Sequence, residues 1–232
     1  MNRLWGPGPV LVAGPCLLDS PDVNRRIGDA LAELGRDLGI TVVFKASFDK
    51  ANRAGPRAPR GPGLERGLAA LEQVRGASGL PVLTDIHEPG QAEPAAKVVD
   101  ALQVPAFLCR QTDLLLAAGA AGKPVNLKKG QWLAPEAMEG AVGKLRAGGA
   151  RDIAVTERGT FFGYGDLVVD MRSFRRMRRA TGCPVLYDAT HAVQLPGSGP
   201  GGSSGGSRED VPALLRAAAG AGADGFFLET HP

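Results

Sequence analysis

The sequence predicts a (β/α)8 barrel formed by a single domain over residues 1–232. Short apolar runs rich in Val, Leu, Ile and Phe alternate with longer Ala-, Leu- and Arg-rich segments of helical periodicity. This alternation is typical of a parallel sheet. Successive runs lie about 20 to 40 residues apart, with no break in composition that would mark a domain linker. Eight such repeats favour closure into a barrel.

The apolar runs predict the strands, and polar or ionisable residues close or follow each of them. The runs lie near residues 9–14, 41–47, 81–86, 101–107, 125–129, 153–157, 185–189 and 225–229. The polar residues, in the same order, are Cys16 and Asp19, Lys45 and Lys50, Asp85 and His87, Arg110 and Gln111, Lys128 and Lys129, Glu157 and Arg158, Asp188 and His191, and Glu229 and His231. Barrel enzymes carry their catalytic groups at this end of the strands, so we expect an active site there.

Helices are expected between the strands, near residues 22–38, 64–77, 90–98, 111–121, 135–147, 167–180 and 208–220. Helix starts are indicated near Asp22, Pro135 and Ser207. Gly39, Gly122 and Gly148 favour left-handed helix ends. The sequence ends at Pro232, directly after the eighth run and without an eighth helix. A closed barrel would leave that strand's outer face uncovered, so we expect that the natural protein continues or that a following segment is missing.

An open, doubly wound sheet is the alternative to a barrel. Its dinucleotide site would place a glycine fingerprint directly after the first strand. The residues there read AGPCLLDS, which is no such fingerprint. The sequence therefore favours the barrel.

Two loops interrupt the repeat. They read AGPRAPRGPGLERG at 54–67 and LPGSGPGGSSGGSRE at 195–209. Their composition is equally typical of flexible linkers. Because both follow the C-terminal ends of strands, where barrel enzymes keep mobile lids, their position favours a lid role.

Composition and charge exclude several classes of protein. The chain is 44% hydrophobic and 22% charged, a balance typical of soluble globular domains. A net charge of +3 with only 5% aromatic residues argues against a nucleic-acid partner. Three scattered cysteines are too few for a disulfide framework and indicate a reducing compartment. Gly and Pro interrupt the N-terminal apolar residues, so we expect no signal peptide, no membrane span and a cytoplasmic location.

Lysines are clustered at two of the predicted strand ends. Four of the seven lie in FKASFDK at 44–50 and NLKKG at 126–130. With Arg158 and Arg53 they predict a site for phosphate and carboxylate groups, although isolated lysines of this kind are usually surface residues paired with acids. The segment MRSFRRMRR at 171–179 is instead expected to be a solvated helix face rather than an anion or membrane site.

A metal site is a second hypothesis for this end of the barrel. Cys16, His191 and Glu229 end strands that become neighbours when the barrel closes, and their side chains suit a divalent metal. The spacing of these residues in the sequence supports two interpretations of Cys16 equally, as a metal ligand and as a small core residue. Cys109 and Cys183 are expected in the core. His87 and His231 are interpreted as hydrogen-bonded scaffold. Asp85 and Asp188 are interpreted first as groups that orient neighbouring cations, with a role as acid–base groups as the alternative.

Eight segments together resemble the 3-deoxy-D-manno-octulosonate 8-phosphate synthases. They are FKASFDKANR, RGPGLE, TDIHEP, PAFLCRQTDLL, NLKKGQ, ERGTFFGYGDLVVDMR, YDATHAVQLPG and FFLETHP. The resemblance runs in order from about residue 9 to residue 232. It implies condensation of phosphoenolpyruvate with arabinose 5-phosphate and water, with release of phosphate, in lipopolysaccharide biosynthesis. It also implies a homotetramer with no nucleic-acid or membrane partner.

The resemblance implies roles for particular residues. Those expected in catalysis are Lys45, Lys50, Lys128, His191 and Asp85. Those expected to bind substrate are Ser47, Asn52, Arg53, Ala106, Arg110, Gln131 and Arg158. Phosphoenolpyruvate would lie on Lys50, Lys128, Gln131 and Arg158, with the sugar phosphate on Lys45, Asn52 and Arg53. Arg110 would reach the sugar phosphate of a neighbouring subunit. Lys129 is expected to face away, because strand alternation turns it from the side that Lys128 faces.

The family divides by metal use, and Cys16 places this chain with the class that binds a divalent ion. The metal ligands implied are Cys16, His191 and Glu229, without distinguishing Zn, Fe, Mn and Cd. A fourth ligand, an Asp, is expected about ten residues beyond the last one given. Ala54 replaces a serine that usually contacts the sugar phosphate, a loss of about 0.5–1.5 kcal/mol unless a loop amide substitutes.

Two other functions stay open on the sequence. The related 3-deoxy-D-arabino-heptulosonate 7-phosphate synthases share fold and chemistry, use erythrose 4-phosphate and lack the KANR pattern of residues 50–53. A barrel that binds sugar phosphates without catalysis is the other alternative. The set of Lys45, Lys50, Lys128, Arg158 and His191 argues against it.

Overall fold

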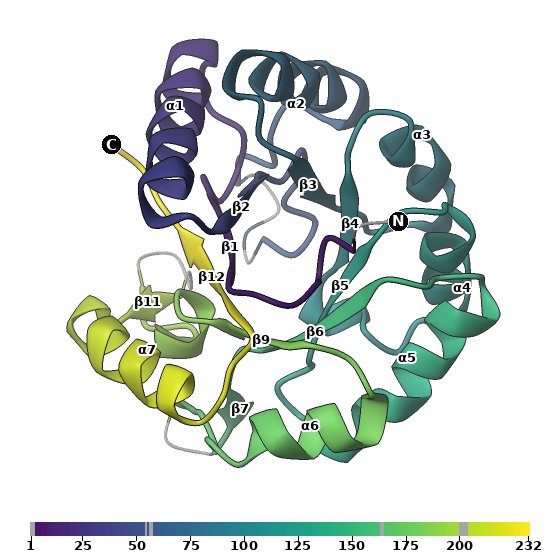
Figure 1. Ribbon diagram of the computed structural model, residues 1–232, viewed down its shortest axis with the longest axis vertical. Coiled ribbons are helices and arrows are strands. Elements are labelled where there is room, and N and C mark those ends of the chain that lie inside the picture. The colour runs from purple at the N-terminus through teal and green to yellow at the C-terminus, as the bar shows by residue number, and fades with distance from the viewer. Residues whose placement is uncertain (1–2, 54, 56–57, 163–164, 200–203) are drawn as a thin grey trace.

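The computed structural model describes residues 3–53, 55, 58–162, 165–199 and 204–232. Its centre is a closed barrel of parallel strands in the order β1, β12, β9, β6, β5, β4, β3 and β2 (Figure 1). These strands are β1 (Val10–Gly14), β2 (Thr41–Lys45), β3 (Val82–Asp85), β4 (Ala101–Val104), β5 (Val125–Lys128), β6 (Ile153–Glu157), β9 (Val185–Asp188) and β12 (Gly225–Glu229). Pairing of β1 with β12 closes the barrel, which confirms the predicted fold class.

Helices surround the barrel as a ring (Figure 1). They are α1 (Pro21–Leu38), α2 (Leu64–Ser78), α3 (Ala92–Ala96), α4 (Thr112–Ala120), α5 (Met138–Ala147), α6 (Ser173–Thr181) and α7 (Val211–Gly220). Helix α1 begins where expected, because the Ser20 hydroxyl accepts a hydrogen bond from the Val23 amide. It ends at Gly39, whose φ of 61° is the predicted left-handed cap.

The segment 167–180 was predicted as one helix, and its first part is wrong. Residues Leu167–Val168 form strand β8, which pairs antiparallel with β7 (Thr160–Phe161). Helix α6 starts only at Ser173, whose amide donates to the carbonyl of Asp170. The Asp170 side chain also accepts from the Arg172 amide, so local hydrogen bonds set this start later than the apolar periodicity indicates.

Two other predicted ranges are too long. The strand predicted over 101–107 ends at Val104, since Pro105 has no amide to continue the ladder and the 3₁₀ turn η2 (Ala106–Leu108) follows. The helix predicted over 90–98 is a 3₁₀ turn, η1 (Pro89–Gln91), followed by the single-turn helix α3. Similar turns, η3 (Pro135–Ala137) and η6 (Arg208–Asp210), precede α5 and α7.

Gly148 was predicted to end its helix in the left-handed conformation, and this is wrong. Its φ is −72°, and the positive φ of 111° falls on Gly149 instead. Gly148 serves close packing: a Cβ there would lie 2.4 Å from the Leu116 carbonyl oxygen of α4. The glycine is therefore explained by contact between α4 and α5 rather than by its own backbone angle.

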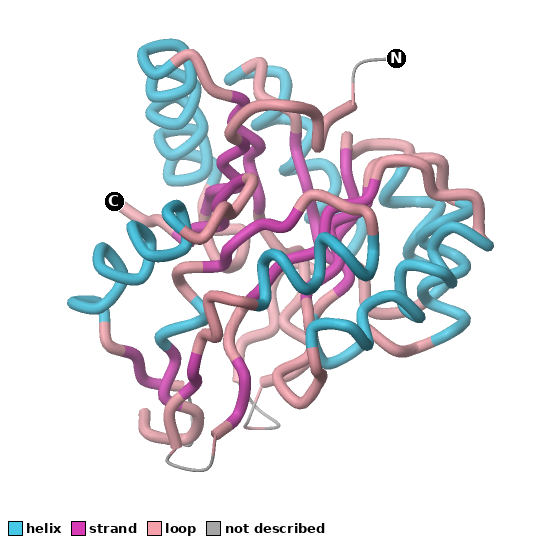
Figure 2. Tube along the Cα trace, turned by 60° about the horizontal axis from the view of Figure 1, so that its bottom comes forward, coloured by secondary structure: helices cyan, strands magenta, loops and turns pink. Residues whose placement is uncertain are grey.

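The loops after the strands gather at one end of the barrel. Two short hairpins lie there: the one formed by β7 and β8, and a second that pairs β10 (Gln194–Leu195) with β11 (Gly205–Gly206). Both appear as short magenta segments at the lower edge of Figure 2. Residues 54, 56–57 and 200–203, within the two predicted lids, lie outside the described residues, as does the Ala54 departure. The lid role stays a prediction.

The core has two layers. Inside the barrel, Trp5, Val12, Val43, Leu83 and Phe227 form an apolar cluster with other buried residues. A larger cluster lies between the strands and the helices and includes Cys109 and Cys183, as predicted. Arginines of α6 pair with acids on the surface, in agreement with a solvated face. Among the described residues no helix is long and apolar enough to cross a membrane.

Replacing Gly14 with alanine is expected to destabilise the fold at the entrance to the site. Gly14 ends β1, and a Cβ on it would lie 2.1 Å from the backbone oxygen of Lys45 in β2. The strands would have to separate, so we expect Gly14→Ala to lower the free energy of unfolding by at least about 2 kcal/mol. Urea denaturation measures this change.

The matched control is Gly143→Ala in α5, where an added Cβ meets no atom of the described residues within 4 Å. Alanine there is expected to raise the free energy of unfolding by about 0.5–1 kcal/mol. Equal stability of Gly14→Ala and the wild type would show that the strands tolerate the extra methyl group.

Candidate active site

A cavity lies at the C-terminal ends of the barrel strands, where the sequence predicted a site. Its charged and polar lining residues are Lys45, Lys50, Asn52, Asp85, His87, Gln103, Lys128, Gln131, Arg158, Asp188 and His191. Lys45, Asp85, Lys128 and Asp188 are each the last residue of a strand. Because parallel strands of a barrel end at one rim, side chains that are distant in sequence meet in one cavity.

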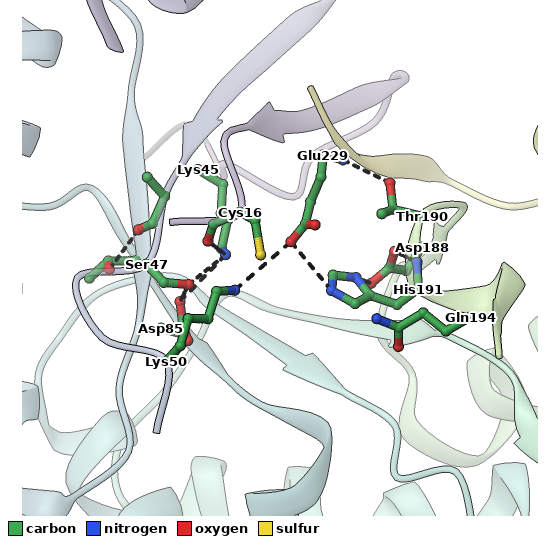
Figure 3. A network of polar contacts seen from close by, with 12 residues as sticks. Cys16, Lys45, Ser47, Lys50, Asp85, Asp188, Thr190, His191, Gln194 and Glu229 are labelled. Atoms are coloured by element: carbon green, nitrogen blue, oxygen red, sulfur yellow. Dashed lines mark hydrogen bonds and ion pairs between the residues drawn. The ribbon is translucent and has the colours of Figure 1, made fainter. Parts of the chain in front are cut away.

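Lys45 and Asp85 form the centre of one network, shown in Figure 3. The Lys45 ammonium donates to Ser47 Oγ at 2.8 Å and lies 3.5 Å from Asp85 Oδ1. Ser47 Oγ donates to the same carboxylate, and His87 Nε2 lies 3.0 Å from Asp85 Oδ2. Burial alone would raise the pKa of Asp85, but Lys45 and His87 outweigh it and hold that pKa well below its usual range. Asp85 is therefore an anion that holds Lys45 and Ser47 in place.

Lys128 is the centre of the second network. Its ammonium donates to Asp188 Oδ2 at 2.7 Å and lies 3.2 Å from the centroid of the Phe227 ring. Burial lowers the pKa of Lys128 from 10.5 to about 8, a shift that Asp188 partly offsets. Asp188 also binds the Nδ1 atom of His191 at 2.8 Å. Asp188 thus contacts both the Lys128 ammonium and the His191 imidazole and can orient the two side chains.

Arg158 and Gln131 each carry a buried polar atom that has no hydrogen-bond partner among the described residues. Arg158 Nη2 donates to Gln194 Oε1 at 2.8 Å, whereas Nη1 is buried without a hydrogen-bond partner among the described residues. Gln131 Oε1 is likewise buried and unpaired within the described part of the chain. Both side chains line the cavity. Because leaving such groups unpaired costs free energy, the pair is suited to a polar ligand, and the guanidinium to an anion.

The predicted metal ligands lie beside Lys50 at the junction of β1, β9 and β12. His191 Nε2 is 3.3 Å from Glu229 Oε1, and Lys50 Nζ is 4.0 Å from the same oxygen. Figure 3 shows the Cys16 sulfur directed toward Glu229 and Lys50. Burial raises the pKa of the Cys16 thiol, Glu229 raises it further, and Lys50 acts in the opposite direction. In the described part of the chain, no three His, Cys, Asp or Glu side chains are grouped closely enough to hold a metal ion.

The structure brings together most, but not all, of the predicted substrate-binding residues. Asn52 and Ala106 line the cavity with the lysines. Ser47 is fully buried beneath Lys45. Arg53 is exposed, and its Nε donates to the Pro59 carbonyl, so it does not line the cavity. Arg110 is also exposed and lies outside the lining.

Lys129 faces away from the cavity, as strand alternation predicted. It is fully buried, and its ammonium lies 3.4 Å from Glu157 Oε1. Glu157 is adjacent to Arg158 in the sequence, but its carboxylate accepts hydrogen bonds from the Arg158 and Gly159 amides, and its ionic partner is Lys129.

Gln103 and Phe227 are among the site residues that were missed from the sequence. Gln103 lies within β4 rather than after it, lines the cavity and accepts a hydrogen bond from Asn126. A polar residue inside the apolar run ALQV was the available signal. Phe227, which lies against Lys128, looks in the sequence like any buried strand residue, so no local pattern indicates it.

A closed parallel barrel with Lys45, Lys50, Lys128 and Arg158 around one rim cavity defines a barrel enzyme for anionic substrates. The sequence matches the DAHP synthetase I family over residues 5–232. This chain belongs to that family.

Relatives named 2-dehydro-3-deoxyphosphooctonate aldolase are similar over nearly the whole chain. The protein from Syntrophotalea carbinolica is 59% identical, covering 98% of this chain and 82% of the relative. That from Desulfotalea psychrophila is 54% identical, covering 96% and 79%. That from Geobacter sp. strain M21 is 56% identical, covering 99% and 84%.

Proposed function

We propose that this enzyme condenses phosphoenolpyruvate with D-arabinose 5-phosphate and water to give 3-deoxy-D-manno-octulosonate 8-phosphate and phosphate, in lipopolysaccharide biosynthesis. The observation that carries this proposal is the gathering of Lys45, Lys50, Lys128 and Arg158 around one cavity. Two phosphates and a carboxylate require that much positive charge. Relatives more than 50% identical carry the name of this activity.

The proposed binding roles divide the cavity in two. Lys128, Gln131 and Arg158, with Lys50, would hold phosphoenolpyruvate. Arg158 Nη1 supports this role, since it has no partner within the described residues and an acidic group would complete its hydrogen bonds. Lys45, with Asn52, would hold the sugar phosphate, and Arg53 would join them only by leaving the Pro59 carbonyl and turning toward the cavity. The role of Lys45 is supported by its fixed position, because its ammonium contacts Ser47 Oγ and the Asp85 carboxylate.

The proposed reaction forms one carbon–carbon bond. C3 of phosphoenolpyruvate bonds to the aldehyde carbon of the sugar, whose oxygen takes up a proton and becomes a hydroxyl. Water adds at C2 and loses its proton, and the bond from C2 to the phosphate oxygen then breaks to release phosphate. Positive charge develops at C2, while negative charge develops on the aldehyde oxygen and the leaving phosphate. Fixed charges such as Asp188 and Lys128 are already oriented before these charges form, which is the arrangement that lowers the barrier.

A divalent metal held by Cys16, His191 and Glu229 is part of the proposal. The donor set fits a borderline ion. Asp188 binds His191 Nδ1 and leaves Nε2 directed at Glu229, which is how a carboxylate prepares a histidine ligand. Glu229 Oε1 is buried and lies 3.3 Å from His191 Nε2, so the two proposed ligands already face each other. When bound, the metal would supply a Lewis acid that orients the aldehyde.

Removal of divalent metal is expected to abolish turnover, and added metal to restore it. Cys16→Ala removes one proposed ligand, so the purified variant should contain much less metal than the wild type, measured by elemental analysis. Cys183→Ala is the control: Cys183 lies buried in the outer core, so metal content should be unchanged. Full activity after exhaustive chelation would rule out the metal.

Binding of phosphoenolpyruvate is expected to weaken as the pH rises through about 8. The folded pKa of Lys128 is lowered to about 8, so its ammonium is present below that pH and is lost above it. Loss of this positive charge should raise KM for phosphoenolpyruvate between pH 7 and 9, and Lys128→Arg should shift that rise upward, because a guanidinium stays charged. A KM that does not change over this range would contradict the role of Lys128.

Side-by-side rates with two sugars test the reaction. Arabinose 5-phosphate should support phosphate release from phosphoenolpyruvate, and erythrose 4-phosphate should support little. The opposite preference would identify the heptulosonate reaction, which the family's description includes. Ligand binding without turnover of either sugar would contradict catalysis.

A homotetramer in the cytoplasm completes the proposal. Phe107 and Trp132 stack with their ring centroids 6.2 Å apart, and each is about half exposed beside the cavity. An aromatic pair of this kind is suited to an interface. The exposed Arg110 lies nearby in sequence and would reach a neighbouring subunit from there. Light scattering of the purified protein should give a mass equal to that of four chains.

The location in the cytoplasm is supported by the cysteines. All three are free, as is usual in a reducing compartment.

A further inference from the structure

Lys129 and Glu157 form a buried ion pair directly behind the active site. Their side chains are 0% and 1% exposed, and Lys129 Nζ lies 3.4 Å from Glu157 Oε1. Neither residue lines the cavity. Burial of two charges is costly, and apolar residues of similar volume often replace such a pair without loss of stability. Packing alone therefore does not explain the pair.

The Lys129 ammonium connects two loops. It donates to the carbonyl of Gly130 at 3.2 Å and to that of Leu133 at 3.5 Å, both in the loop after β5. It also donates to the carbonyl of Gly159 at 3.5 Å, in the loop after β6, and to the hydroxyl of Thr160 at 3.1 Å, where that loop enters β7. One buried cation thus fixes the two loops relative to each other.

Glu157 completes this connection from the other side. Its Oε1 accepts from the amide of Arg158 at 3.0 Å and from that of Gly159 at 2.8 Å. The same loops are joined again where the Phe161 amide donates to the Gln131 carbonyl at 3.0 Å. The backbone next to Arg158 and Gln131 is therefore held in place by two sets of hydrogen bonds. One set is made by the Lys129 and Glu157 side chains, and the other is the direct backbone bond between the two loops.

These two loops carry the residues proposed to hold phosphoenolpyruvate. Lys128 and Gln131 lie on either side of the Lys129–Gly130 step, and Arg158 directly follows Glu157. We propose that Lys129 and Glu157 are positioning residues that set the distance of Arg158 from Lys128 and Gln131, and so the affinity for the acidic groups of phosphoenolpyruvate. This inference rests on the proposed function. The pair touches no substrate and acts only through its neighbours.

The experiment separates positioning from stability. Lys129→Met leaves the Glu157 carboxylate buried without its cation, so this variant should unfold at much lower urea concentration. The double variant Lys129→Met/Glu157→Gln removes both charges at nearly constant volume, and its urea midpoint should recover toward that of the wild type. It still lacks the ammonium that joins the loops. KM is then measured separately for phosphoenolpyruvate and for arabinose 5-phosphate.

In the double variant we expect KM for phosphoenolpyruvate to rise about tenfold or more, since small displacements of binding groups have effects of this size. KM for the sugar phosphate, held on the β2 side of the cavity, should change less than about twofold. Glu157→Gln alone keeps an oxygen for the Arg158 and Gly159 amides. It should raise KM for phosphoenolpyruvate less than the double variant does. If the double variant does not fold, the rise in KM of this single variant tests the inference instead.

Val74→Ala is the control for destabilisation alone. Val74 is buried in α2, on a different part of the helical ring (Figure 1), so this variant should lower the urea midpoint without changing either KM. The inference is overturned if a folded double variant binds phosphoenolpyruvate as the wild type does, or if Val74→Ala raises the same KM equally. Failure of the wild type to use phosphoenolpyruvate and arabinose 5-phosphate would instead overturn the proposed function.

Discussion

Arg158→Met is expected to lower kcat/KM for phosphoenolpyruvate by about 10²–10³-fold, the usual effect of removing one prearranged group that stabilises developing charge. Arg158 is 7% exposed and lines the cavity, and its Nη1 atom is buried without a hydrogen-bond partner in the described residues. Methionine keeps much of the side-chain volume but removes the guanidinium, so the substrate would lose a two-pronged anion contact. Steady-state kinetics with each substrate varied in turn measures the change.

Arg158→Lys refines this prediction. Lysine keeps the positive charge but cannot form two parallel hydrogen bonds, so its activity should fall between those of the wild type and Arg158→Met. Arg146→Met is a matched control on the outer layer, where the arginine donates to the Thr181 carbonyl and does not line the cavity. If Arg158→Met and Arg146→Met have equal kinetic constants, Arg158 does not bind the substrate.

Asp188→Ala is expected to lower the free energy of unfolding by about 3–5 kcal/mol, because it leaves Lys128 buried without its counter-charge. Asp188 is 1% exposed, and its Oδ2 atom accepts from Lys128 Nζ at 2.7 Å and lies 2.8 Å from His191 Nδ1. Burial alone would raise the pKa of Asp188, but His191 and Lys128 outweigh it and hold that pKa well below its usual range. Urea denaturation at pH 7 measures the loss.

The pH dependence of stability provides a second measurement on Asp188. Its folded pKa lies below the unfolded value near 3.9. The stabilisation is therefore fully present above pH 5 and is lost as the pH falls below about 4. Asp188→Asn cannot titrate, so its stability should decline less steeply in acid by up to about 1.4 kcal/mol per pH unit.

An exposed ion pair is the control for Asp188. Glu93 pairs with Lys97 on the surface, where the two side chains are 82% and 70% exposed, and replacement of Glu93 by alanine should change stability little, because water screens that pair. Equal effects of Asp188→Ala and Glu93→Ala would show that burial adds nothing to the Lys128 pair.

The barrel could be predicted from the sequence because its signal is local and repeated. Each strand is a buried apolar run, and each helix carries a stripe of apolar residues, so both can be recognised without knowledge of the rest of the chain. The hairpin of β7 and β8 was missed since each of its strands has only two residues, too few for any period. The start of α6 was misplaced for a related reason: the Asp170 hydrogen bonds, not periodicity, determine it.

The rim of the site could be predicted as well. In a parallel barrel every strand delivers its last residue to the same end, so Lys45, Asp85 and Lys128 had to meet. Family motifs added roles that strand ends alone do not assign, above all for Cys16. Arg53 shows the limit of this reasoning, since it lies outside the cavity lining. The contact of Arg110 with a neighbouring subunit stays a prediction.

The sequence by itself determined the order of strands and helices, the end of the barrel that holds the site, and the family to which the chain belongs. Strand alternation even separated Lys128, which faces the cavity, from Lys129, which faces away. Only the tertiary structure decided which charges pair. Lys129 lies against Glu157, and Lys128 lies between Asp188 and the Phe227 ring. Periodicity comes from the backbone of each segment, whereas these pairings join segments dozens of residues apart and depend on how the whole barrel closes.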